Sequence, residues 1–252
     1  MKKSLSQIKD IVKDAKQGKM FILVDSKNRE NEGDLIIPAS KCNSKNINFM
    51  AMHGRGLICL ALTKKKVDKL SLPLMSSVNK ARMQTAFTVS IEAKKGITTG
   101  ISAFDRAKTI KVAIRLKSTK KDIVSPGHVF PLVARKGGVL ERAGHTEASV
   151  DISKLANLNP SAVICEVMNE DGRMARLDDL LRFAKKHKLK IASIEDLISY
   201  RLKNENFIKN IFNKKLHIDN YKNLNIRSFR DTLDNSEHFS ISKGKIKSNK
   251  SI

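Results

Sequence analysis

Acidic side chains crowd one short segment of an otherwise basic chain. Residues 25–34 lie between two apolar stretches and carry carboxylates at Glu30, Glu32 and Asp34. In an extended backbone alternate residues point to the same side, so these charges would repel one another unless a cation or a proton intervened. Hard oxygen ligands suit Mg²⁺ or Mn²⁺. Taken alone, such a segment is more often a solvated acidic turn.

A second group of reactive side chains follows a pair of glycines. Residues 137–147 contain Arg142, His145 and Thr146 just before a predicted helix. Backbone N–H groups at the start of that helix, together with Arg142 and Thr146, could hold a phosphate. His145 could instead ligate a metal, transfer a proton or simply cap the helix.

Two more side chains have surroundings that suit proton transfer. His128 lies between a Pro-Gly turn and an apolar strand, which constrains its imidazole. It is equally compatible with a core histidine that bonds a backbone carbonyl. Glu166 lies within the apolar run 163–168, where an unpaired carboxylate is costly to ionise. Either a function or a structural ion pair would account for it.

Alternating helical and strand patterns must position these side chains over the first 204 residues. Helices are predicted at 5–15 with a stop at Gly18, from Ser102 to about Arg115, at 177–184 and from Glu195 to about Lys203. Strands are predicted at 21–24, 57–62, 86–91, 161–168 and 190–194. Several strand pairs lack an intervening helix, so we expect one large α+β domain with a mixed sheet.

Composition narrows the classes of partner. The apolar fraction is 40% and no apolar run is long enough to cross a bilayer, so we expect no membrane partner. The formal charge of +24 invites a nucleic-acid interpretation. However, the lysines are scattered and only 5% of residues are aromatic, so we favour a solvated surface and expect no nucleic-acid partner. Three separated cysteines and the lack of a signal peptide indicate a cytoplasmic protein.

The character of the chain changes after residue 204. The remaining residues are rich in Asn, Lys and Ser and show weak periodicity. We therefore expect a catalytic domain at 1–204 and a basic extension at 205–252. Within the extension, we expect disorder from Ser240 to Ile252.

Several sequence blocks occur together in one order along the chain. They lie at 29–34, 53–59, 85–89, 99–102, 105–106, 126–131, 141–147 and 165–166. Through these blocks, residues 4–202 resemble the 3,4-dihydroxy-2-butanone 4-phosphate synthase family of riboflavin biosynthesis. The resemblance implies a lyase that converts the sugar phosphate ribulose 5-phosphate into 3,4-dihydroxy-2-butanone 4-phosphate and formate, with Mg²⁺ or Mn²⁺ as cofactor. It also implies a homodimer with active sites near the interface.

The same resemblance implies roles for individual residues. Glu30 and His145 would be the metal ligands, with Glu32 as a further candidate ligand. His128 and Glu166 would be the catalytic acid/base residues. Cys59 would line the pocket or merely fill the core. The substrate would be held by Arg29, Glu30, Asp34, Arg142, Ala143, Gly144, His145, Thr146 and Glu166.

Residues 216–246 resemble, more faintly, the opening strands of GTP cyclohydrolase II. That family uses a cysteine-ligated zinc, and this chain has no cysteine after Cys165, so we expect no such activity. The extension is then a degenerate remnant of that domain, or an unrelated lysine-rich extension. The alternative function for the whole chain is a catalytically silent relative that binds a partner enzyme. The retained Glu30, His128, His145 and Glu166 argue against this alternative.

Overall fold

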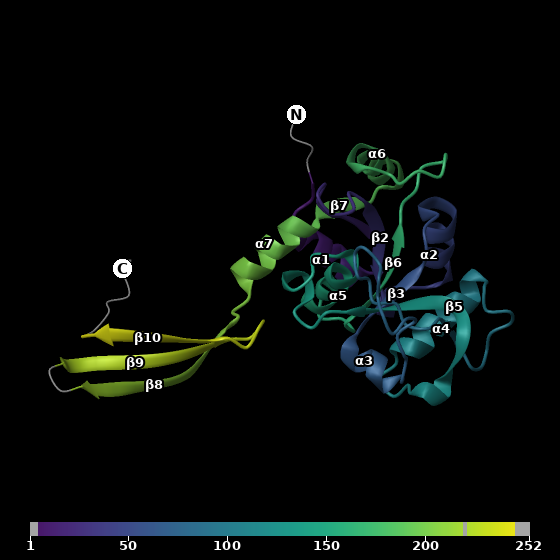
Figure 1. Ribbon diagram of the computed structural model, residues 1–252. Helices are drawn as coiled ribbons and strands as arrows, with labels where there is room; N and C mark the ends of the chain where they lie inside the picture. Colours follow the sequence, from purple (N-terminus) through teal and green to yellow (C-terminus); the bar gives the residue numbers. More distant parts are fainter. Residues whose placement is uncertain (1–4, 219–220, 245–252) are drawn as a thin grey trace. The chain divides into compact units, whose positions relative to one another are not determined.

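The computed structural model describes residues 5–218 and 221–244. By its internal contacts the chain divides into two compact units, residues 1–200 and residues 201–252. The larger unit contains a seven-stranded sheet with helices packed on it, and the smaller unit contains a three-stranded sheet (Figure 1). Within the described residues, no helix combines the length and the apolar character that a membrane span requires.

Helices and strands alternate along the larger unit. The helices are Ile8–Gln17 (α1), Ser44–Phe49 (α2), Lys64–Lys69 (α3), Ala103–Ile114 (α4), His145–Leu155 (α5), Leu177–His187 (α6) and Ile194–Asn204 (α7). The strands are Phe21–Val24 (β1), Gly33–Pro38 (β2), Cys59–Thr63 (β3), Ile91–Ala93 (β4), Ile123–Ala134 (β5), Ser161–Glu166 (β6) and Lys190–Ser193 (β7). Short 3₁₀ or π turns lie at Ala39–Lys41, Met50–Gly54, Lys120–Asp122 and Gly138–Leu140.

The seven strands have the order β4-β5-β3-β6-β2-β1-β7. The β3–β5 and β1–β7 pairs are parallel and the other pairs are antiparallel, so the predicted mixed sheet is confirmed. Because β6 runs against both of its neighbours, its C-terminal end lies at the start of β2 and β3. There Glu166 pairs with Asp34, and Ile164 pairs with Cys59.

Both faces of this sheet are covered, which explains why its central strands are apolar over continuous runs. On one face Ile22 and Leu35 belong to a buried cluster with side chains from α2, α3, α4 and α6. On the other face Phe21 and Ile36 belong to a cluster with side chains from α1, α5 and the first part of α7. The larger unit is therefore a three-layered α/β/α arrangement (Figure 1).

Local signals place the predicted helices where they form. Gly18 adopts a left-handed conformation with φ 76° immediately after α1, as the predicted helix stop requires. Ser102 caps α4, since its hydroxyl accepts a hydrogen bond from the Asp105 N–H at 3.0 Å. Both predictions are confirmed.

The strand predicted at 86–91 is wrong. The alternation of side chains is present, but neighbouring residues of this segment bond to different parts of the chain. The Thr88 N–H donates to the Pro131 carbonyl at 3.0 Å, whereas the Val89 N–H donates to the Pro73 carbonyl at 3.1 Å. No continuous ladder can form under this arrangement, and β4 starts only at Ile91, the last residue of the segment.

The extended conformation expected for the acidic segment is also wrong. The N–H groups of Arg29 and Asn31 both donate to the Ser26 carbonyl, at 3.0 and 3.2 Å, so the chain turns tightly here. Asn31 has a positive φ of 55°, which asparagine tolerates better than most residues. The acidic side chains are therefore grouped by a turn and not by strand alternation.

The smaller unit contains the antiparallel strands Ile208–Ile218 (β8), Tyr221–Asp231 (β9) and Glu237–Lys243 (β10), in the order β10-β9-β8. Residues 240–243 end β10, so the disorder predicted from Ser240 is wrong for them. The part of that prediction that covers residues 245–252 lies outside the described residues. The remnant of a GTP cyclohydrolase II domain stays a prediction.

Candidate active site

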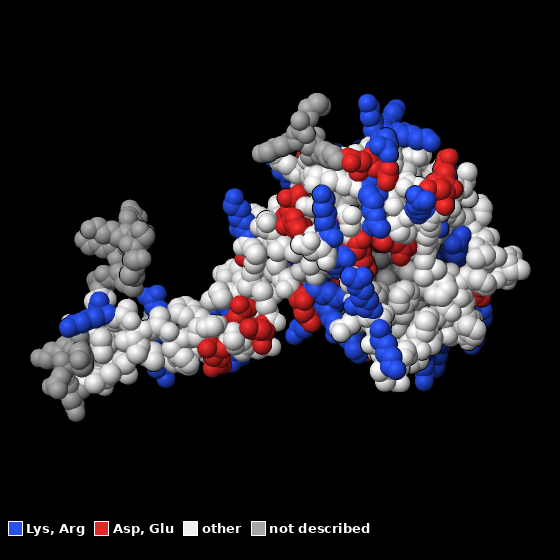
Figure 2. All heavy atoms as spheres, turned by 45° about the horizontal axis from the view of Figure 1, so that its top comes forward, with Lys and Arg blue, Asp and Glu red and all other residues white. Residues whose placement is uncertain are grey.

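A cavity of about 230 Å³ opens where β2, β3 and β6 meet the start of α5. Its lining is acidic in a chain of net charge +24. On the face shown in Figure 2, Lys and Arg side chains are spread over the larger unit, while Asp and Glu side chains form small groups between them. The lining residues are Arg29, Glu30, Glu32, Asp34, Cys59, Thr85, Phe87, Leu132, Arg142, His145, Thr146, Ile164 and Glu166.

Asp25 organises the turn that carries two of these carboxylates. Its side chain is almost fully buried and accepts hydrogen bonds from the Glu30 N–H at 3.1 Å and the Glu32 N–H at 2.9 Å. It also pairs with the Arg29 guanidinium at 2.8 Å. Arg176, the residue just before α6, closes the turn, because its guanidinium donates to the Glu30 carbonyl at 2.8 Å.

The helix α5 brings His145 to the same place from far along the sequence. Its Nδ1 lies 3.8 Å from a Glu30 carboxylate oxygen and 3.7 Å from an Asp34 carboxylate oxygen. The side chain is buried, with 7% of its surface exposed. The predicted convergence of Glu30 and His145 is therefore present within a single protomer.

Burial and crowding set the charge state of this group. Burial raises the pKa of Asp34 to about 7, opposed by His145 and assisted by neighbouring carboxylates such as Glu166. Burial, together with the charge of Glu30, also raises the pKa of Glu32. His145 is the largest influence on Glu30 and lowers its pKa to about 2. The group therefore favours an added positive charge.

The pKa of His145 is also raised, although burial acts on an imidazole in the opposite direction to a carboxylate. Burial would lower its pKa, but the charges of Asp34 and Glu30 outweigh this and raise the pKa to about 9. A proton on His145 thus supplies the positive charge that the carboxylates favour. A divalent cation bound to the same groups would supply more.

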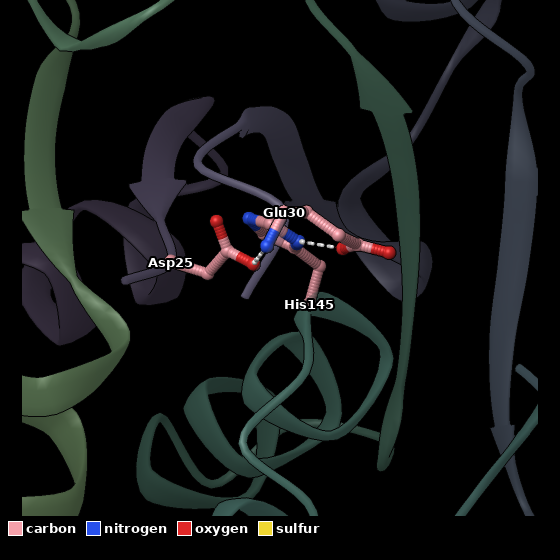
Figure 3. A group of neighbouring side chains, drawn as sticks. All are labelled: Asp25, Glu30 and His145. Atoms are coloured by element: carbon pink, nitrogen blue, oxygen red, sulfur yellow. Dashed lines mark hydrogen bonds and ion pairs between the residues drawn. The ribbon is translucent and has the colours of Figure 1, made fainter. Parts of the chain in front are cut away.

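The residues present fit a divalent metal ion. One ligand atom from each of Asp25, Glu30 and His145 lies within 4.8 Å of the others (Figure 3). Within the described residues, His145 Nε2 is buried and has no hydrogen-bond partner. Asp25 already accepts three hydrogen bonds, so we regard it as support for the turn. Glu30 and His145 stay the predicted ligands.

Glu166 reaches the cavity from the end of β6. One of its carboxylate oxygens accepts a hydrogen bond from the Leu57 N–H at 2.8 Å. Gly56 packs directly on this side chain, because a Cβ at residue 56 would lie 2.8 Å from the Glu166 Cβ. Within the described residues, the carboxylate is thus held by a backbone amide and not by an ion pair with Arg or Lys.

The predicted anion cradle at 137–147 is only partly present at the cavity. Thr146 and Arg142 line it, and Ala143 and Gly144 connect them without lining it. Gly138 lies instead against Asp151, whose carboxylate accepts a hydrogen bond from the Val139 N–H at 2.8 Å. The paired glycines therefore serve the fold, and the cradle is confined to 142–146.

Arg142 and Cys59 have constrained roles at the cavity wall. The Arg142 guanidinium donates to the Met83 carbonyl, the Thr85 hydroxyl and the Glu147 carboxylate at 2.6–2.9 Å. Burial raises the pKa of the Cys59 thiol, so the thiol is poorly suited to act as a nucleophile. Cys59 both lines the cavity and belongs to the core.

His128 does not line the cavity of its own protomer. It lies on β5, with 44% of its side chain exposed, and its Nδ1 contacts the Glu92 carboxylate. The structure thus brings Glu166 together with the predicted metal ligands. His128, the second predicted acid/base residue, lies outside this group.

Sequence reasoning missed four residues that shape the site. Asp25 follows a predicted strand directly, which could have identified it as the anchor of the turn. Arg176 reaches the turn from a distant helix, and nothing in its sequence neighbourhood indicates this contact. Thr85 and Phe87 line the cavity, although the strand predicted at 86–91, which includes Phe87, does not form there.

Comparison with known proteins gives consistent matches. A family model described as 3,4-dihydroxy-2-butanone 4-phosphate synthase matches residues 9–200. The chain is similar to the 3,4-dihydroxy-2-butanone 4-phosphate synthase of Photobacterium phosphoreum, with 50% identity over 98% of this chain and 68% of that protein. It is also similar to the riboflavin biosynthesis protein RibBA of Aquifex aeolicus, with 49% identity over 97% and 61%. The chain spans about two thirds of the length of these curated relatives.

Solved structures of similar proteins extend the comparison to the fold. RibBX of A. baumannii, a two-domain 3,4-dihydroxy-2-butanone 4-phosphate synthase, superposes with a TM-score of 0.84 at 45% identity, over 95% of this chain and 70% of that one. A 3,4-dihydroxy-2-butanone 4-phosphate synthase in complex with two magnesium ions superposes with a TM-score of 0.76 at 39% identity. That match covers 79% of this chain and 98% of the other.

Proposed function

Because the chain belongs to the 3,4-dihydroxy-2-butanone 4-phosphate synthase family, we propose that it converts ribulose 5-phosphate into 3,4-dihydroxy-2-butanone 4-phosphate and formate. The activity would make it a lyase of riboflavin biosynthesis. The observation that carries the proposal is the meeting of Glu30 with His145 beside Asp34 and Glu166 in one acidic cavity.

Glu30 and His145 would hold the metal ion, Mg²⁺ or Mn²⁺. The magnesium complex of a similar protein supports a divalent ion. With only these two protein ligands, an octahedral ion keeps positions for substrate oxygens and for water. When bound, the ion acts as a Lewis acid toward the substrate carbonyl. Glu32 would lie close enough to bind through water or to assist as a further ligand.

The substrate would be fixed by groups around the ion. Arg29, Asp34 and the loop 142–146 supply donors and acceptors on the cavity wall. The phosphate would lie near Thr146, where the start of α5 offers backbone N–H groups and a positive partial charge. Arg142 would contribute its charge while its hydrogen bonds keep it in place.

Glu166 would move protons on and off the substrate carbons. Its carboxylate lines the cavity and keeps one oxygen bonded to the Leu57 N–H, which fixes the side chain without neutralising it. The second oxygen can then accept a substrate proton and return it later. This bond to a backbone amide supports a catalytic role over a structural ion pair.

We further propose that the enzyme is a homodimer. Large apolar side chains are exposed at the start of α4 and on β5. Ile101 is 54% exposed, Phe104 75% and Val124 41%. Exposed apolar surface of this kind marks interaction sites, and a second copy of the chain would cover it.

The dimer would also give His128 its function. His128 also lies on β5, four residues after Val124, exposed and outside the cavity of its own protomer. Across an interface formed at this edge, it would enter the partner's cavity and complete the acid/base pair with Glu166. The active sites would then lie at the subunit boundary.

Cellular location and the alternative function complete the proposal. We place the enzyme in the cytoplasm, which is supported by its three free cysteines, Cys42, Cys59 and Cys165. A catalytically silent binding module is not favoured, because the acidic cavity keeps its metal ligands and Glu166. The absence of a nucleic-acid partner stays a prediction.

The direct test is formate release. The full chain is incubated with ribulose 5-phosphate and Mg²⁺, and formate is quantified with and without a chelator. We expect release with Mg²⁺, loss with the chelator and recovery after Mg²⁺ is restored. A folded protein that binds Mn²⁺ but yields no formate with either metal would contradict the proposal.

A further inference from the structure

The strand β5 leaves its partner β4 for four residues around His128. Val124 pairs with Glu92 and Val129 pairs with Ile91, so residues 125–128 have no partner on β4. Such a bulge bends the strand and re-aims the side chains it carries. His128 is the last residue of the bulge, so its direction is set by how the bulge is held.

Two contacts hold the bulge against Ser90, the residue just before β4. The Gly127 N–H donates to the Ser90 hydroxyl at 3.0 Å, and the Ser125 hydroxyl donates to the Ser90 carbonyl at 2.7 Å. A Cβ at residue 127 would overlap the Ile91 backbone and the Glu92 side chain. Glycine therefore lets the bulge lie directly on β4, next to the Glu92 side chain.

Glu92 lies in a slot between two glycines. Gly127 lies on one side, and a Cβ at Gly100 would overlap the Glu92 carboxylate. The wall at Gly100 is itself fixed, because its N–H donates to the Asp105 carboxylate at 3.1 Å. Gly100 has a φ of 91°, a conformation that residues other than glycine rarely adopt.

The carboxylate in this slot meets His128. Glu92 Oε1 contacts His128 Nδ1, and the Glu92 side chain is only 15% exposed. Within the described residues, His128 is the only hydrogen-bond partner of this carboxylate. An ionised carboxylate can only accept, so this contact fits a proton on the imidazole Nδ1.

We propose that Glu92 is the positioning residue of His128. Its carboxylate accepts the Nδ1–H, which fixes the neutral imidazole in one tautomer and leaves Nε2 as a free base directed away from β4. When Nε2 takes a substrate proton, the imidazolium forms beside the negative charge of Glu92, and Nε2 later returns the proton. The inference deepens the proposed function, because it rests on His128 as an acid/base residue.

The tautomer can be observed in the native protein without an assay of turnover. The full chain is labelled with ¹⁵N in its six histidines, and the imidazole nitrogens are recorded by NMR. His128→Asn identifies the His128 signals by their loss. We expect a protonated Nδ1 and an unprotonated Nε2 in the neutral form. The reverse pattern, a bare Nδ1 with a protonated Nε2, would overturn the proposal.

Two substitutions then test the link to turnover. Glu92→Gln keeps the size of the side chain, but its amide can donate to Nδ1 and select the wrong tautomer. We expect kcat to fall by about 10²–10⁴-fold, with KM changed less than about threefold, as for loss of an orienting group in a catalytic triad. Glu92→Asp keeps the carboxylate and should retain the native tautomer and part of the lost turnover.

The control is Glu170→Gln, which changes an exposed carboxylate outside the cavity. We expect its kcat and its His128 signals to match those of the native chain. A Glu92→Gln variant with the native tautomer and a kcat within about threefold of native would overturn the proposal. If the native chain releases no formate, the proposed function fails, while the ¹⁵N signals still decide the role of Glu92.

Discussion

A buried carboxylate that binds no substrate can still decide whether a metal site forms. Asp25 holds Arg29 and the amides of Glu30 and Glu32 at once. Asp25→Ala should lower the free energy of unfolding by about 2–4 kcal/mol, because a half-buried guanidinium and two amides lose a hydrogen-bond acceptor. It should also weaken Mn²⁺ binding by about tenfold or more, since Glu30 loses its support. Urea denaturation and calorimetric titration measure the two effects.

Asp68→Ala is the matched control for this substitution. Asp68 is 57% exposed and pairs with Lys64 on the same helix. We expect a change within about 0.5 kcal/mol and unaltered Mn²⁺ affinity. If the Asp25→Ala protein loses less free energy of unfolding than expected and binds Mn²⁺ with native affinity, the turn does not depend on Asp25.

The raised pKa of His145 makes metal binding depend on pH. In the metal-free protein this pKa is about 9, so His145 carries a proton at neutral pH. The metal needs a neutral imidazole, so each ion must displace that proton. Mn²⁺ affinity should therefore rise about tenfold per pH unit up to about pH 9. The rise should be steeper below about pH 7, where Asp34 also takes up a proton.

Titration calorimetry in two buffers with different ionisation enthalpies counts the protons released. We expect about one proton per Mn²⁺ at pH 8. His145→Ala should bind Mn²⁺ more weakly and release no such proton. A native affinity that is flat between pH 6.5 and 8.5 would exclude His145 as a ligand.

At the scale of elements, the sequence predicts the helix boundaries whose signals are local. The stop at Gly18 and the cap at Ser102 lie next to the helices they bound, so each could be read from neighbouring residues. The segment 86–91 carries a clear strand pattern but finds two different partners, Pro131 and Pro73. The alternation of side chains indicates the local preference of a segment, whereas its hydrogen-bond partners depend on the tertiary fold.

The same limit applies to the candidate site. Glu30, Asp34, His145 and Glu166 were identified from the sequence and do line one cavity. The turn that groups the carboxylates was not predicted, because Arg176, which holds it, lies 146 residues from Glu30 along the chain. The bulge that carries His128 was missed for the same reason, since it exists only relative to β4.

The loop before β3 approaches the end of β6 so closely that only glycine fits. A Cβ at Gly56 would lie 2.6 Å from the Glu166 carbonyl oxygen and 2.8 Å from its Cβ. Gly56→Ala should therefore lower the free energy of unfolding by about 1–3 kcal/mol. It should also reduce formate release, because the displaced loop carries the Leu57 N–H that holds the carboxylate.

Gly172→Ala is the control, because it introduces backbone strain without a close contact of the kind that Gly56 makes with Glu166. Gly172 has a φ of 83°, and a Cβ there would meet nothing within 4 Å. We expect it to cost about 1 kcal/mol through strain alone and to leave formate release unchanged. Normal turnover in a folded Gly56→Ala protein would show that the close approach does not position Glu166.

At the scale of the whole molecule, the two predicted acid/base residues of one protomer lie apart. Glu166 lies in the cavity, and His128 is exposed on β5 outside it. If each active site takes Glu166 from one subunit and His128 from the other, two inactive variants can repair each other. A mixed dimer of Glu166→Gln and His128→Asn would contain one fully native site and one doubly altered site.

Mixing the two variants should therefore restore formate release. With random exchange of subunits, half of the dimers are mixed and each has one native site, so about a quarter of native activity is expected. Glu166→Gln mixed with Asp34→Asn is the control, because both residues belong to the same cavity and every site stays altered. Recovery in the first mixture alone requires a shared site. Equal failure in both, with subunit exchange verified by mass-labelled chains, would place His128 in its own protomer's chemistry or outside the reaction.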